Sequence, residues 1–135
     1  MSEIPVTGTG TQDLWPAIER LAASFVRRDD ERGVSAEEQW TLQVLKIGEE
    51  FGEAAQAVIG ARGTNPRKGY SHGWSDVQAE VADTAITALV ALARMRPDDA
   101  AEYLARQFAA KSAKFLPGPQ QQPPRDGRPD PEAGG

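Results

Sequence analysis

The chain of 135 residues has no cysteine and a single histidine, His72. Without a thiol it cannot form disulfides, a thiolate zinc site or an iron–sulfur cluster, and it has no cysteine nucleophile. One histidine excludes a His-rich metal site, and a loop histidine beside Gly73 is typically exposed or hydrogen-bonded, so we expect no catalytic role for it. Any chemistry must therefore use carboxylates, hydroxyls, amines, guanidinium groups or a bound hard cation.

Long apolar runs are also missing. The longest, residues 85–93, is about half of the roughly 20 residues that a membrane-spanning helix needs, and the first residues lack the basic and apolar regions of a secretory signal. The formal net charge is −5, whereas a nucleic-acid binder normally has a basic surface. We therefore expect a cytoplasmic protein that binds neither membranes nor nucleic acids. A small anion held by a local cluster of cations stays compatible with this charge.

Strand-like alternation and internal repeats are absent, and only helical periodicity is visible. It predicts one all-α domain over residues 12–116. The expected helices span residues 13–26, 35–61, 75–96 and 98–114. Each of the two middle helices begins with a capping-box pair, Ser35 with Glu38 and Ser75 with Gln78. Four helices give a thin core for a lone monomer of this length.

The C-terminal segment, residues 117–135, contains six of the ten prolines and almost no apolar side chains. Such a segment cannot offset the entropy of ordering, so we expect a disordered tail. A docking peptide in a polyproline II conformation is the alternative.

The predicted helix over 35–61 has two faces of different chemistry. Apolar side chains at helical spacing form the stripe that we expect to be buried: Trp40, Val44, Ile47, Phe51, Ala54 and Val58. A second stripe, about a quarter-turn to one side, contains Lys46, Glu50, Glu53 and Ala57. Glu50 and Glu53 thus project together from the border of the buried face. Taken alone, this pair is more typical of the solvated side of an amphipathic helix.

The predicted helix over 75–96 is apolar almost all round, which indicates a mostly buried helix. Glu80 and Asp83 nevertheless lie in its first two turns, and a buried carboxylate needs a partner. A salt bridge to Lys46 or to a linker arginine would supply one. If the two middle helices pack antiparallel, however, their acidic pairs face each other, and each close pair of carboxylates repels by about 4 kcal/mol at an effective dielectric constant of about 20. A hard divalent cation would relieve this repulsion, and oxygen-only ligation fits Mg²⁺ or Mn²⁺ better than zinc.

The ordered acidic motifs resemble those of the all-α nucleoside triphosphate pyrophosphohydrolase superfamily, the MazG-like proteins. The matching pieces are EEFGE at 49–53, which fits the family's EExxE motif, and EVAD at 80–83, which fits its ExxD motif. The preceding LKIG with Lys46 fits as well, and the linker segments NPRKG and SHGW look similar to one MazG-like branch. The resemblance covers roughly residues 37–115.

The resemblance implies a four-helix bundle completed by oligomerisation, as a homodimer or homotetramer. It implies Mg²⁺-dependent cleavage of a (deoxy)nucleoside triphosphate to the monophosphate and pyrophosphate. The family's metal ligands correspond to Glu50, Glu53, Glu80 and Asp83. Glu49 corresponds to the family's extra glutamate, which would position or deprotonate the attacking water. The basic residues of the last helix near the nucleotide correspond to Lys111 and Lys114, while Ser112 stands where the family often has asparagine.

Further cations lie close to the acidic motifs in sequence and are candidates to hold a triphosphate: Lys46, Arg62, Arg67 and Lys68. Each linker cation singly is also typical of solvated loop charge. Tyr70 or Trp74 could stack on a base, although an aromatic that closes the loop is the commoner role.

Two other functions fit the same residues. One is a non-catalytic helical dimerisation or nucleotide-sensing protein of the same fold. The other is a plain four-helix bundle with surface glutamates.

Overall fold

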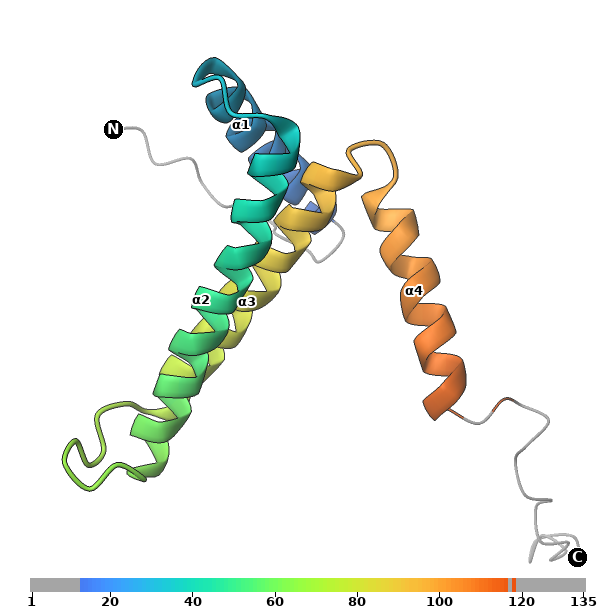
Figure 1. Ribbon diagram of the computed structural model, residues 1–135. Coiled ribbons are helices and arrows are strands. Elements are labelled where there is room, and N and C mark those ends of the chain that lie inside the picture. Colours follow the sequence, from blue (N-terminus) through green and yellow to red (C-terminus); the bar gives the residue numbers. More distant parts are fainter. Residues whose placement is uncertain (1–12, 117, 119–135) are drawn as a thin grey trace, which may run out of the picture. The chain divides into compact units, whose positions relative to one another are not determined.

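The computed structural model describes residues 13–116 and residue 118. Within them it contains four helices and no strand, as the periodicity predicted (Figure 1). The helices are α1 (Leu14–Glu31), α2 (Ala36–Arg62), α3 (Trp74–Met95) and α4 (Ala100–Phe115). In this part of the chain no helix combines the length and the apolar character needed to cross a membrane. The predicted tail, apart from residue 118, lies outside the described residues.

The chain divides into two compact units, one up to Ala101 and one from Glu102 onward. In the first unit α2 and α3 run side by side in opposite directions, and α1 packs mainly on α3 (Figure 1). Its buried apolar core joins Ile18 and Ala22 of α1 to Val90 and Ala93 of α3, together with Ala100. The second unit contains most of α4.

The ends of α2 follow from local sequence. The Ser35 hydroxyl accepts a hydrogen bond from the Glu38 backbone N–H at 3.2 Å, which satisfies one free donor of the first turn. The helix stops at Gly63, whose φ of 61° is the left-handed conformation that glycine adopts without a steric penalty. The predicted start of this helix at Ser35 is confirmed, and the helix ends at Arg62, one residue after its predicted end.

The start of α3 differs from the prediction. Its N-cap is Gly73, whose N–H donates to the Asp76 carboxylate at 2.8 Å. The expected pair of Ser75 and Gln78 is wrong, because the chain is already helical at Trp74 and Asp76 occupies the third helical position.

The buried face of α2 is not the predicted apolar stripe. Its buried residues are Gln39, Gln43, Ala57 and Gly60, whereas Phe51 of the apolar stripe is 67% exposed. Three further members of that stripe, Trp40, Val44 and Val58, are also exposed. The expectation of a buried apolar face is therefore wrong for the single chain, because α3 packs on the neighbouring polar face.

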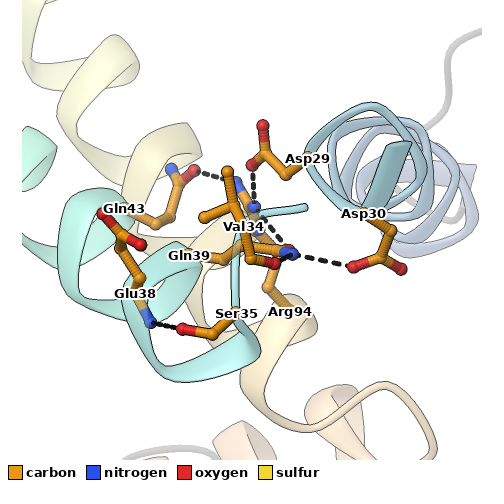
Figure 2. Close-up of polar contacts among 8 residues, drawn as sticks. All are labelled: Asp29, Asp30, Val34, Ser35, Glu38, Gln39, Gln43 and Arg94. Carbon is orange, nitrogen blue, oxygen red and sulfur yellow. Dashed lines mark hydrogen bonds and ion pairs between the residues drawn. The ribbon is translucent and has the colours of Figure 1, made fainter. Parts of the chain in front are cut away.

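A polar network explains why α3 packs there (Figure 2). The Arg94 side chain, only 5% exposed, donates to Gln43 Oε1 at 2.9 Å and to Gln39 Oε1 at 3.1 Å, and it forms an ion pair with Asp29. Gln39 in turn donates to Asp30 Oδ1 at 2.8 Å. Because a buried guanidinium needs acceptors, Arg94 ties the polar face of α2 and the end of α1 to α3.

Candidate metal centre

Three carboxylates converge where α2 and α3 face each other. Glu50 comes from α2, and Glu80 and Asp83 lie one turn apart on α3. Each offers a carboxylate oxygen, and the three oxygens lie within 4.8 Å of one another. The expected opposition of the two acidic pairs thus exists for these three residues. Such a group can hold a cation.

Glu80 is the least satisfied member of this cluster. Its Oε2 is sealed from solvent, and among the described residues no hydrogen-bond donor reaches it. Burial raises the pKa of the Glu80 carboxyl above its ordinary value, and the negative charges of Glu53, Asp83 and Glu50 raise it further. The ionised form of Glu80 therefore lacks a positive partner in this site.

The residues fit a hard divalent cation. Carboxylate oxygens from two helices, without a nitrogen or sulfur donor, match the ligand preference of Mg²⁺ or Mn²⁺. The sealed Glu80 oxygen is relevant to this fit, because a bound cation would give it the hydrogen-bonding or ionic partner that none of the described residues supplies. Glu53 is exposed and is not one of the three converging carboxylates, although its charge helps to raise the pKa of Glu80.

A cavity of about 290 Å³ lies between α1, α2 and α3. None of the three carboxylates lines it, but Thr87 of its wall follows Asp83 by one turn of α3. Lys46, one turn before Glu50 on α2, lines it. Its wall mixes apolar and polar groups, among them Leu21, Phe25, Leu42, Ile86, Gln43 and Arg94. The sequence did not indicate Gln43 or Arg94 as site residues. A polar residue on a helix is expected to be exposed to solvent unless the helix that packs on it is known.

The other predicted site residues are more dispersed. Glu49 is exposed on α2 and is not one of the three converging carboxylates. Arg67 and Lys68 lie in the α2–α3 loop, where Lys68 lines a second cavity. Lys111 and Lys114 lie on α4, where they line a cavity that belongs to the second unit, so they are described apart from the carboxylates.

Comparisons of the chain with protein-family models, curated proteins and solved structures found no match.

Proposed function

We propose that the chain is a cytoplasmic, Mg²⁺-dependent nucleoside triphosphate pyrophosphohydrolase of MazG-like fold, with Mn²⁺ as an alternative metal. The observation that carries the proposal is the convergence of Glu50, Glu80 and Asp83, with one Glu80 oxygen sealed from solvent and unpaired. The resemblance of EEFGE and EVAD to the family's motifs supports the same reaction.

The reaction needs an aligned water and neutralisation of charge on the phosphate oxygens. When bound, Mg²⁺ supplies that neutralisation and lowers the pKa of water. Glu50, Glu53, Glu80 and Asp83 would hold the cation at the α2–α3 contact. Glu49 would orient the attacking water and accept its proton. The water oxygen bonds to the α-phosphorus as the bond from that phosphorus to the bridging oxygen breaks, so pyrophosphate leaves and the monophosphate remains.

The cavity between α1, α2 and α3 supports a nucleotide as substrate. Apolar side chains such as Phe25 can contact a base, and Lys46, which lines this cavity one turn before Glu50 on α2, can pair with a phosphate. Lys111 and Lys114 stay predictions for phosphate binding.

The exposed apolar stripe of α2 supports a homodimer or homotetramer. Phe51, Trp40, Val44 and Val58 form one face along α2, and such a face on a soluble protein marks an interaction site. A second copy of this chain is the partner we propose, since the thin core of one copy leaves this face uncovered.

Pyrophosphate release across a panel of nucleoside triphosphates, with and without Mg²⁺, tests the activity. We expect Mg²⁺-dependent release that Glu80→Gln and Asp83→Asn reduce by at least about 100-fold, a loss that corresponds to about 2.7 kcal/mol of transition-state stabilisation. Glu38→Gln is the matched control, since Glu38 is exposed at the start of α2. If no triphosphate is turned over but one binds with Mg²⁺ in a Glu80-dependent manner, the chain is a nucleotide sensor. Unchanged Mg²⁺ binding in Glu80→Gln would refute the site.

Sedimentation equilibrium tests the assembly. Phe51→Glu should shift the protein toward the monomer, because it places a charge in the centre of the apolar face. Leu14→Glu, at a position that is 48% exposed on α1, should not. Equal behaviour of the two variants would argue against the α2 face as the interface.

A further inference from the structure

The loop between α2 and α3 folds back on the last turns of α2. A Cβ atom at Gly60 would overlap the side chains of Ser71 and His72, and one at Gly63 would lie 2.7 Å from the Tyr70 ring. Both glycines thus permit a close approach that any other residue would block. The loop is therefore held against α2 at two points.

This contact encloses a cavity of about 260 Å³ with a distinctive lining. Side chains that can donate hydrogen bonds surround it: Gln56, Asn65, Lys68, Ser71 and His72. None of the described residues that line it is acidic, although acidic residues outnumber basic ones in the chain. Lys68, which is exposed, therefore gives the described lining of this cavity a positive charge without an acidic residue to offset it.

Two hydrogen bonds leave donors available to a ligand. Asn65 Oδ1 accepts from the Arg67 N–H at 3.0 Å, so the acceptor end of that amide is used and its two N–H groups remain. Ser71 Oγ lies 2.8 Å from His72 Nδ1. When the Ser71 hydroxyl donates to Nδ1, the imidazole proton is on Nε2, which can then donate outward. Donors around one ammonium suit the oxygens of a phosphate group.

The position of this cavity relative to the carboxylates is fixed by α2. Gln56 follows Glu50 by six residues of α2, about 9 Å along the helix axis, and Gly60 follows Gln56 by one turn. The cavity beside Lys46 lies one turn beyond Glu50 in the opposite direction. The carboxylates therefore lie between a cavity with apolar walls and a cavity of hydrogen-bond donors.

We propose that the loop cavity binds the β- and γ-phosphates of the substrate and the pyrophosphate product, with Lys68 as the main contact. This inference rests on the proposed function, because it assigns the leaving group of that reaction to a place. It also assigns the bound nucleotide an orientation along α2, with the nucleoside toward Lys46 and the pyrophosphate toward the loop.

Binding of inorganic pyrophosphate in the presence of Mg²⁺, measured by titration calorimetry on the full chain, tests this directly. Lys68→Met should weaken binding by about tenfold or more, as expected for the loss of a charge-assisted hydrogen bond. Arg67→Met removes the next loop cation, which does not line the cavity, and should have an effect at least about threefold smaller. Arg20→Met, a charge-matched change on α1, should leave binding within about twofold.

Product inhibition of turnover separates this inference from the proposed function. Lys68→Met should raise the inhibition constant of pyrophosphate and leave that of the nucleoside monophosphate unchanged. If both constants rise equally, or if Lys68→Met and Arg20→Met bind pyrophosphate alike, the loop cavity is not the pyrophosphate site, whether or not the enzyme turns over. If pyrophosphate binding depends on Lys68 but no triphosphate is hydrolysed, the anion site stands and the proposed activity falls.

Discussion

Replacing Arg94 by methionine is expected to destabilise the protein by about 3–5 kcal/mol, the cost typical of breaking a buried ion pair on one side only. The Arg94 guanidinium donates three hydrogen bonds, to Gln43, Gln39 and Asp29. At about 1.5 kcal/mol for each bond to a charged group, their loss comes to about 4.5 kcal/mol. Arg94 Nε is buried without an acceptor among the described residues. Burying this N–H group without an acceptor costs free energy. Methionine fills a similar apolar volume and has no such group, so the substitution recovers about 1 kcal/mol.

Arg96→Met is the matched control for this change. Arg96 is paired with Asp99 at 2.7 Å, but both side chains are more than a third exposed. Exposed ion pairs contribute little to the free energy of unfolding, so we expect Arg96→Met to lower it by less than about 1 kcal/mol. Urea denaturation followed by circular dichroism gives both free energies of unfolding from the midpoints at a common slope. If Arg94→Met costs no more than Arg96→Met, the network is not what ties α1 and α2 to α3.

Two further predictions concern the carboxylates and the loop. Because the folded-state pKa of Glu80 is raised above its ordinary value of 4.5, its contribution to stability is full below that value and is lost as the pH rises through the raised pKa. Thermal melting in EDTA across that pH range should show this loss of stability in the parent protein and in Glu38→Gln but not in Glu80→Gln. If the melting temperature depends on pH equally in all three proteins, the ionisation of Glu80 is not the cause of the loss. Gly60→Ala should lower the melting temperature at a cost of about 1–3 kcal/mol, because its Cβ would overlap Ser71 and His72. Gly48→Ala has open space around the new Cβ and should instead stabilise α2 by up to about 1 kcal/mol, so a shift of the same sign in both would contradict the close approach at Gly60.

The sequence alone was sufficient to predict those features of the fold that depend on local interactions. The Ser35 cap and the Gly63 stop depend on residues within one turn, so the bounds of α2 were predictable. The opposition of Glu50 to Glu80 and Asp83 followed from helical period and antiparallel packing. The start of α3 was missed because two capping pairs compete within a few residues, and Asp76 with Gly73 is the one that forms.

The face of α2 that packs on α3 could not be predicted from α2. Its apolar stripe is the better candidate by hydrophobicity, yet Gln39 and Gln43 are buried instead, since Arg94 on the partner helix requires their oxygens. A choice of this kind depends on a residue more than 50 positions away in sequence.

The Arg94 network has a consequence for the rotation of α2 about its own axis. Gln43 precedes Glu50 by two turns, so the two side chains share one side of the helix. Turning α2 by a single residue, about 100°, would take Gln39 and Gln43 away from Arg94 and leave a buried charge without those acceptors. The network therefore selects one rotational setting of α2, and that setting directs Glu50 toward Glu80 and Asp83. The orientation of a candidate metal ligand is thus determined by an interaction that contains no metal ligand.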